Sequence, residues 1–339
     1  MTATTICDIP PGTPVLVTGA TGFTGAVLTR KLVDAGLSVR AIARMSSDLS
    51  PLDDLDIRWF RGDNYDAKVV RAAADGVAYV FNVAAAYRAA GIGDDVYHKV
   101  HVEGTQRLAE AVVGNPEFKR FVHVSTVGVH SHIDNPPADE DYPFQPDDIY
   151  QTTKAEAEIW IRDFARERNL PFTVIRPAAI MGPDDRRLLK FFRMAAKGRL
   201  VLLGHKEISY HLIHVEDLAN VLILAATHPG AEGEVFICGN ARPISFCEMG
   251  AIIARAVGRK LRVVRVPAAP VFLAAALCEN LCKPFGWEPP LHRRRVAFFT
   301  KNRAFDTTKL RETLGYEPIY DNERGISQTA RAYREKGWM

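Results

Sequence analysis

The sequence predicts an α/β protein: a doubly wound parallel sheet with a smaller C-terminal α/β lobe that binds substrate. Residues 15–17 form a short apolar run, which is typical of a fully buried parallel strand. Gly19, Gly22 and Gly25 follow at three-residue spacing, and from Ala26 the apolar residues recur with the helical period. Similar strand-like and helix-like segments then alternate, which indicates βαβ units.

Length and composition exclude several classes of protein. The 339 residues fit one large domain or two closely joined ones. A net charge of +3, with no arginine-rich arm, gives no indication of nucleic-acid binding. The five cysteines form no CxxC pair and the histidines have no ligand spacing, so we expect no metal and no disulfide framework. Without a signal sequence or an apolar run of about 20 residues, a cytoplasmic location is expected.

The glycine turn predicts a dinucleotide site. Backbone amides at a helix N-terminus, together with the helix dipole, attract the pyrophosphate. The glycines allow a tight turn, close approach to the phosphates and close packing of helix on strand. Because the turn follows a buried strand and starts a βαβ pattern, the context for this fingerprint is met. The predicted cofactor residues of the turn are Gly19, Thr21, Gly22, Phe23, Thr24 and Gly25.

The ends of the next strands predict contacts with the rest of the cofactor. Residues 39–44 read as the second strand, and Arg44 stands where an acid would bind the ribose of NAD. An arginine suits the phosphate of NADP, so NADP(H) is favoured over NAD(H), although Arg44 could be a solvated charge. Residues 57–60 read as the third strand. Asp63, followed by Asn64, is placed to reach the adenine edge, or else forms a turn.

Three more strands continue the pattern. Residues 78–85 read as the fourth strand, whose small residues Val83, Ala84 and Ala85 let the backbone lie close to the cofactor. Residues 121–126 read as the fifth strand and end in two hydroxyls. Residues 172–176 read as the sixth. Helices are expected near 69–74, from about 100 to 112, from 150 onward, and over 188–198.

Tyr150 and Lys154 are the predicted proton-transfer pair. They lie four residues apart, and so share one face of a helix. Tyrosine has a free pKa of about 10, and a nearby ammonium stabilises its phenolate. A hydroxyl of Ser125 or Thr126 could hold a substrate oxygen beside the phenol while nicotinamide takes or gives hydride. The alternative interpretation is that Tyr150 and Lys154 are an exposed pair on a helix with no part in catalysis.

These motifs together resemble the extended short-chain dehydrogenase/reductase family over nearly the whole chain. The resemblance implies that Tyr150 is the general acid/base and that Lys154 lowers its pKa and holds the nicotinamide ribose. It implies that the strand-end hydroxyl binds the substrate oxygen; spacing favours Thr126 over Ser125. It also implies that Pro177, Ala179 and Ile180 lie against the nicotinamide. The motifs are residues 19–25, 62–63, 123–126, 150–154, 176–183 and 214–219.

Residues near the predicted catalytic positions and in the C-terminal segment indicate which branch of this family the chain resembles. Similar dehydratases carry an acidic pair directly after the catalytic hydroxyl, where this chain has Val127 and Gly128. Epimerases often carry an Arg-Asp pair before the HVxDLA segment, where this chain has Tyr210 and His211. Residues 293–306 and 314–318 look more like the 3β-hydroxysteroid and sterol dehydrogenase branch, with ketone reductases as close neighbours.

The expected function is therefore oxidation or reduction of a secondary alcohol or ketone on a hydrophobic, alicyclic molecule. A nucleotide-sugar epimerase, which uses the same residues, is the alternative. A non-catalytic dinucleotide-binding regulator is a weaker one, because a sensor needs no proton donor.

The sequence also predicts a division into two domains and indicates candidate partners. Residues 1–180 and about 208–228 are assigned to the cofactor domain, and about 181–207 and 229–339 to the substrate lobe. Residues 267–282 are largely apolar and precede basic residues. This segment either packs over the substrate pocket or, through residues 267–287, touches the inner face of a membrane. The resemblance implies a homodimer through two long helices, which the periodicity alone does not determine.

Overall fold

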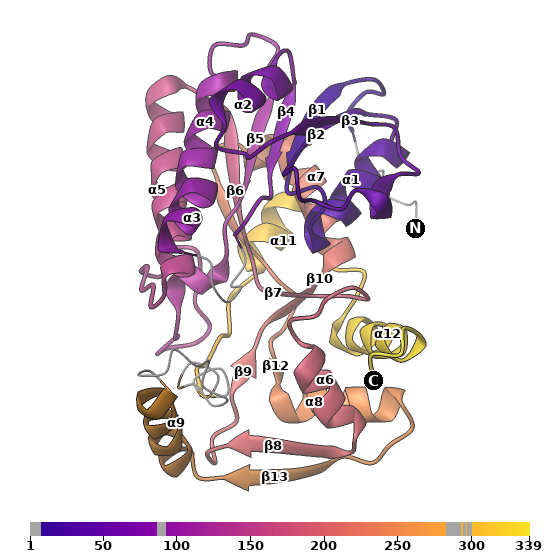
Figure 1. Cartoon of the computed structure of the whole chain (residues 1–339), viewed down its shortest axis with the longest axis vertical. Coiled ribbons are helices and arrows are strands. Elements are labelled where there is room, and N and C mark those ends of the chain that lie inside the picture. Colours follow the sequence, from indigo (N-terminus) through magenta and orange to yellow (C-terminus); the bar gives the residue numbers. More distant parts are fainter. Residues whose placement is uncertain (1–7, 87–92, 283–292, 294–295, 297–299) are drawn as a thin grey trace.

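The computed structural model describes residues 8–86, 93–282, 293, 296 and 300–339. Its centre is a seven-stranded sheet in the order β11-β6-β5-β4-β1-β2-β3, with every neighbouring pair parallel (Figure 1). The strands are β1 (Pro14–Thr18), β2 (Ser38–Ala43), β3 (Ile57–Arg61), β4 (Tyr79–Asn82), β5 (Arg120–Val124), β6 (Phe172–Pro177) and β11 (Val235–Cys238). The doubly wound sheet is confirmed: β2 and β3 are added on one side of β1, and from β4 onward the strands are added on the other side.

Helices cover both faces of this sheet. One face packs on α1 (Phe23–Asp34), α7 (Val215–Thr227) and α11 (Thr308–Leu314). The other packs on α2 (Ala67–Ala74), α4 (Gly104–Val112) and α5 (Ile149–Arg168). Alternate residues of β1 enter opposite cores: Val15 and Val17 face α1, and Leu16 faces the second group. Burial on both faces explains why β1 reads as a continuous apolar run.

Several predicted boundaries change. The fourth strand ends at Asn82, so residues 83–86 form a loop rather than strand. The helix expected over 100–112 is compound: α3 (Asp94–His98) runs through the π-helical turn η2 (Lys99–Glu103) into α4. The other short turns are 3₁₀ helices: η1 (Ser50–Leu52), η3 (Val127–His130) and η4 (Pro229–Ala231).

The domain boundary after residue 228 is too early. The strand β11 lies within the segment assigned to the substrate lobe, yet it pairs in parallel with β6 at the edge of the central sheet. Helix α11 also returns to this body, since Leu310 and Leu314 share the core of α1 and α7. The short strand β10 (Leu212–His214) pairs with β7 (Ala179–Met181) outside the central sheet.

The remaining elements form a lobe beyond the carboxyl edge of the sheet (Figure 1). Strand β8 (Arg199–Leu203) pairs in parallel with β13 (Arg262–Val266), and β9 (Ser209–Tyr210) pairs in antiparallel with β12 (Ile244–Ser245). Helices α6 (Leu189–Ala196), α8 (Phe246–Ala256) and α12 (Asn322–Glu335) share one apolar core with these strands. Helix α9 (Ala268–Cys282) completes the lobe. None of the described helices is long and apolar enough to cross a bilayer.

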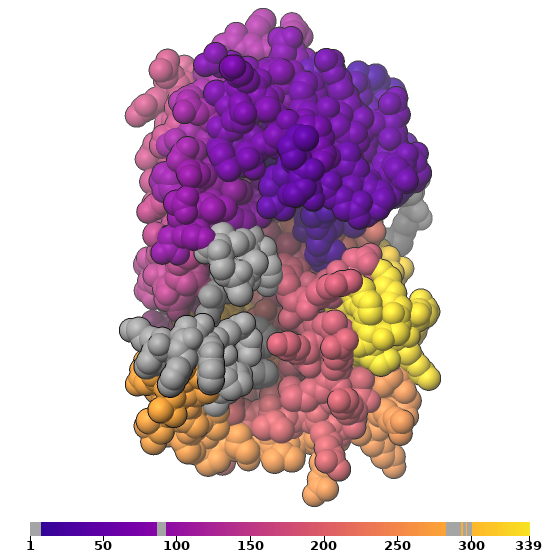
Figure 2. Space-filling model, in the orientation of Figure 1, coloured from indigo at the N-terminus to yellow at the C-terminus, as the bar shows by residue number. Residues whose placement is uncertain are grey.

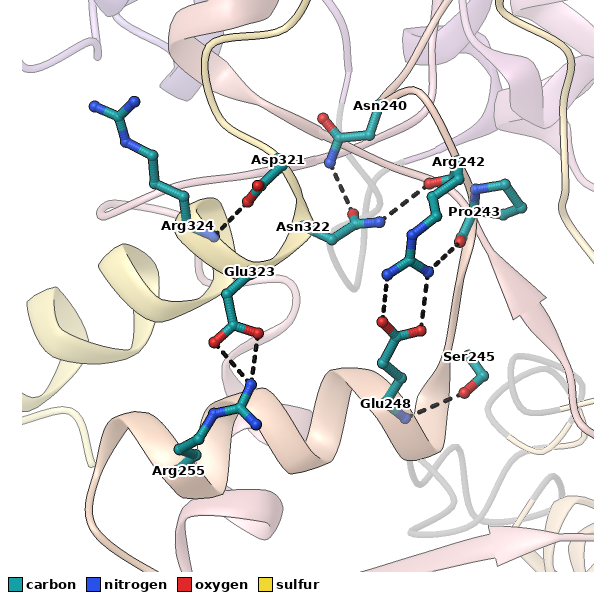
Figure 3. A network of polar contacts seen from close by, with 10 residues as sticks. All are labelled: Asn240, Arg242, Pro243, Ser245, Glu248, Arg255, Asp321, Asn322, Glu323 and Arg324. Atoms are coloured by element: carbon teal, nitrogen blue, oxygen red, sulfur yellow. Dashed lines mark hydrogen bonds and ion pairs between the residues drawn. The ribbon is translucent and has the colours of Figure 1, made fainter.

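Polar contacts join the lobe to the sheet (Figure 3). Asn240 follows β11, and its Nδ2 donates to Oδ1 of Asn322 at 2.7 Å; Asn322 in turn donates to the carbonyl of Arg242 at 3.1 Å. Both asparagines are buried, and these two hydrogen bonds fix α12 to the end of β11. Exposed ion pairs lie around this contact: Arg242–Glu248 and Arg255–Glu323.

Candidate active site

The glycine turn has the shape of a phosphate cradle. Gly19 has φ +72°, in the left-handed region, and a Cβ on it would lie 2.8 Å from Cα of Ala84. A Cβ on Gly25 would lie 2.0 Å from the carbonyl oxygen of Gly19. The N-cap of α1 is Gly22, which has no side chain to accept hydrogen bonds from the first-turn amides. These residues fit a dinucleotide whose pyrophosphate accepts from those amides.

The predicted cofactor residues lie along one edge of the sheet. Parallel strands end at the same edge, so the loops after β1, β3, β4, β5 and β6 lie there together. The hydroxyl of Thr18 donates to Oδ1 of Asn82 at 2.8 Å and accepts from the amide of Ala84 at 3.2 Å. These bonds fix the loop of Val83, Ala84 and Ala85 beside the glycine turn.

At the predicted adenosine end, the structure shows the contacts of Asn64 and adds a second arginine. Asn64, predicted to bind cofactor, is buried and donates from Nδ2 to the carbonyl of Val100 at 2.9 Å, so its amide packs against η2. Arg44 is exposed just beyond β2. Arg61, which the sequence reasoning missed, donates from Nη2 to the carbonyl of Met45 at 2.7 Å, and its buried Nη1 has no hydrogen-bond partner among the described residues. Two guanidinium groups thus flank the turn after β2.

The first two turns of α5 carry the tyrosine and the lysine. The helix begins after Asp148, whose carboxylate accepts from the amide of Gln151 at 2.9 Å. Tyr150 lies in the first turn and is half-buried. Lys154 is 3% exposed and donates from Nζ to the carbonyl of Val124, the last residue of β5, at 2.9 Å. Burial lowers the pKa of Lys154 to about 8, while the Glu158 carboxylate opposes that shift.

The two candidate hydroxyls have different environments. Thr126 is half-buried, and its Oγ1 accepts from the amide of Gly128 at 3.0 Å, which leaves the hydroxyl hydrogen for another acceptor. Ser125 is buried, and its Oγ has no partner in the described part of the chain. Of the two residues, Thr126 is thus the less buried, and its hydroxyl is held in place by the amide of Gly128.

His101 contacts the back of the tyrosine. The π-helical turn contains His101, whose ring lies edge-on to that of Tyr150 with centroids 5.3 Å apart. Its Nε2 accepts from the amide of Ala86 at 3.0 Å, so Nδ1 carries the hydrogen and faces Oγ1 of Thr153 at 2.8 Å. Desolvation, with Lys154 nearby, lowers the pKa of His101 to about 2. A neutral imidazole therefore joins the β4 loop to α5; the sequence indicated only a packing residue.

A buried ion pair supports the same helix. Glu158, one turn beyond Lys154, accepts from Nη2 of Arg176 on β6 at 2.6 Å and from its Nε at 3.1 Å. Both side chains are buried, and Nη1 of Arg176 also donates to the carbonyl of Glu140 at 2.7 Å. The motif of residues 176–183 includes this arginine, but nothing local in the sequence indicates its partner.

Comparison with known proteins is consistent with this geometry. The family model for the NAD dependent epimerase/dehydratase family matches residues 15–239. A 3β-hydroxysteroid dehydrogenase/Δ5→4-isomerase of Mycobacterium tuberculosis is 30% identical over 93% of this chain and 88% of its own length. A 2-alkyl-3-oxoalkanoate reductase of Stenotrophomonas maltophilia is 30% identical over 92% of this chain and 97% of its own. The crystal structure of gox2253 superposes with a TM-score of 0.79 at 28% identity, covering 96% of this chain and 99% of that one.

Proposed function

This chain belongs to the NAD-dependent epimerase/dehydratase family of extended short-chain dehydrogenases/reductases, and we propose that it interconverts a secondary alcohol and a ketone on a hydrophobic substrate. A sterol-like or other alicyclic compound is the proposed substrate class. The observation that carries the proposal is the position of Tyr150 and Lys154, on the first turns of α5 at the sheet edge that bears the glycine turn.

The proposed chemistry is a proton transfer coupled to hydride transfer. When bound, the nicotinamide gives or accepts the hydride. Tyr150 exchanges the proton with the carbinol oxygen, and Thr126 holds that oxygen through its hydroxyl. Lys154, fixed by the Val124 carbonyl, places its ammonium where it favours the phenolate and reaches the nicotinamide ribose. The ring of His101 packs edge-on against the ring of Tyr150 and so helps to position it.

The substrate class is supported by the relatives. Two of them, each about 30% identical over more than nine-tenths of this chain, are named for a 3β-hydroxysteroid and a 2-alkyl-3-oxoalkanoate. Both names place oxygen on a carbon skeleton that is largely apolar. The chain lacks an acidic pair at Val127 and Gly128, which disfavours the elimination chemistry of dehydratases.

We propose NADP(H) as the preferred cofactor. Arg44 and Arg61 stand at the ends of adjacent strands, and the buried Nη1 of Arg61 has no partner within the part of the chain that the structure describes. A phosphate on the adenosine ribose would accept from such donors, and the 2′-hydroxyl of NAD offers no matching charge. Replacing Arg44 with serine should raise the KM for NADPH by about tenfold, which corresponds to one charge-assisted bond, and change that for NADH little.

Nicotinamide absorbance tests the function directly. The protein is incubated with each cofactor and with hydroxysteroids, sterol ketones, long-chain 3-oxo acids and nucleotide sugars. Net oxidation or reduction of a hydrophobic compound supports the proposal. An isomerised nucleotide sugar with no net change in absorbance would instead establish the epimerase alternative.

The Tyr150→Phe variant tests the mechanism. Loss of the phenol should lower kcat by at least about 10²-fold, the usual size of a general acid/base contribution. Binding of NADPH should stay close to the wild-type value, as measured by fluorescence titration. Tyr320→Phe, which alters a half-buried tyrosine stacked on His214, is the matched control. A Tyr150→Phe enzyme that turns over at a near-normal rate contradicts the mechanism.

A further inference from the structure

The helix α9 is apolar, yet about half of its residues are exposed. Among its 15 residues only Ala275 is buried, and Glu279 is the one charged side chain. Leu273, Leu277 and Leu281, spaced four apart, are 63%, 54% and 70% exposed. Such spacing puts the three leucines on one face of the helix. A helix that is apolar all round is normally buried, so this face calls for an apolar medium or partner.

The two-stranded sheet that precedes α9 in the chain also exposes apolar side chains. Strand β13 enters α9 after one residue, Pro267, and both lie at the end of the molecule farthest from β1 (Figure 1). Val264 on β13 is in register with Val201 on β8, and these side chains are 45% and 43% exposed. Two exposed valines on one face of a short sheet add to the three leucines.

The surroundings of this surface are strongly basic. Residues 197–207 and 259–266 hold seven lysines and arginines against one acid, Glu207, in a chain whose overall net charge is only +3. Arg199 and Arg262 are register partners and are both exposed. Lys206, Arg259 and Lys260 are exposed as well. The orange surface at the bottom of Figure 2 belongs to this part of the chain. Positive charge is thus concentrated beside exposed apolar side chains.

We propose that α9 and the β8–β13 sheet bind the surface of an anionic lipid bilayer. The leucines would enter the boundary between headgroups and acyl chains, while the cations meet anionic headgroups. A second copy of the chain fits this surface less well. A two-fold contact would place the patch against itself, and so would bring like charges together. The proposal does not depend on the substrate class, because it rests only on the surface.

Vesicle flotation tests the proposal with the full-length protein. One set of vesicles contains phosphatidylcholine alone, and the other contains about one third phosphatidylglycerol. The wild type should float with the anionic vesicles at least about tenfold more than with the neutral ones. This difference should shrink at about 0.5 M NaCl, where exposed charges are screened.

Variants separate the two contributions. The triple change Leu273→Ser, Leu277→Ser, Leu281→Ser should abolish flotation, and Arg199→Ser with Arg262→Ser should reduce it severalfold on anionic vesicles only. Ile159→Ser, which alters a 48% exposed isoleucine on α5, should float like the wild type. The proposal is overturned by a wild type that stays unbound, or by a triple variant that floats normally. It is also overturned if light scattering shows that the wild type is a dimer and that the triple leucine variant is a monomer.

Discussion

Replacing Glu158 with glutamine removes one charge from a buried ion pair and leaves its shape almost unchanged. Glu158 is 0% exposed and Arg176 is 1% exposed. The carboxylate accepts from Nη2 of Arg176 at 2.6 Å and from Nε at 3.1 Å, and Arg162 lies 3.6 Å away on its more open side. In the variant, the guanidinium of Arg176 stays enclosed and keeps only neutral acceptors.

The size of the effect follows from this burial. Breaking a buried pair by removing one partner costs about 3–5 kcal/mol, because an uncompensated charge remains inside the protein. An unfolding entropy of about 2.1 cal/mol/K per residue gives about 0.7 kcal/mol/K for 339 residues. The Tm should therefore fall by about 4–7 °C.

Thermal unfolding followed by circular dichroism measures this change. The control is Glu156→Gln, which makes the same substitution at an exposed position two residues away on α5 and should change stability by less than about 0.5 kcal/mol. A second variant, Glu158→Leu with Arg176→Met, removes both charges and should recover most of the loss. If Glu158→Gln unfolds at the same temperature as Glu156→Gln, the pair does not hold α5 on β6.

Three further predictions follow from other groups at the site. The folded-state pKa of Lys154, about 8, lies below its unfolded value of about 10.4. Between about pH 8 and about pH 10.4 the folded chain therefore binds fewer protons than the unfolded chain. The free energy of unfolding should rise over that range, by about 3 kcal/mol in urea titrations, and Lys154→Met should abolish the rise. In Gly25→Ala, the new Cβ would lie 2.0 Å from the carbonyl oxygen of Gly19, so NADPH binding measured by calorimetry should weaken at least about tenfold. The control Gly12→Ala places its Cβ in open space and should not change the affinity. Equal affinities of the two variants would refute the phosphate-binding role of the glycine turn. His101→Phe leaves the amide of Ala86 buried without an acceptor and should cost about 1–3 kcal/mol in stability; a urea midpoint equal to the wild type would exclude that role.

The sequence predicted the central sheet because its signals are local. Val15 to Gly25 contains a buried strand, a turn and a helix start in eleven residues, and each feature can be read without knowing what the segment contacts. Parallel strands must end at one edge, so the strand-end residues Asp63, Ala84 and Thr126 could be assigned to one site. Their position at that edge is confirmed, whereas the roles assigned to them stay predictions.

The errors concern contacts between distant segments. Strand β11 is four apolar residues, a run that fits any buried strand. Its partner β6 ends at residue 177, 58 residues before β11 begins at residue 235, and four short strands and the helices α6 and α7 lie between them in the chain. The contacts of His101 likewise come from the amide of Ala86 and from Thr153, 15 and 52 residues away. A lone histidine without ligand spacing gives no indication of such partners. The partner of the Asn64 amide, the carbonyl of Val100, lies on the π-helical turn, and nothing in the sequence indicated it; the cofactor role of Asn64 stays a prediction.

The buried pair also explains how an enclosed lysine keeps its charge. Desolvation lowers the pKa of Lys154 to about 8, and Glu158, one turn further along α5, keeps it from falling more. Arg176 forms the ion pair that keeps the buried Glu158 carboxylate charged. Arg176 therefore acts on the pKa of Lys154 through Glu158. If turnover requires the charged lysine, then Glu158→Gln should move the alkaline limb of kcat to lower pH, and Glu156→Gln should not. A merely structural pair would lower the Tm and leave that limb in place, so the pH profile separates the two roles.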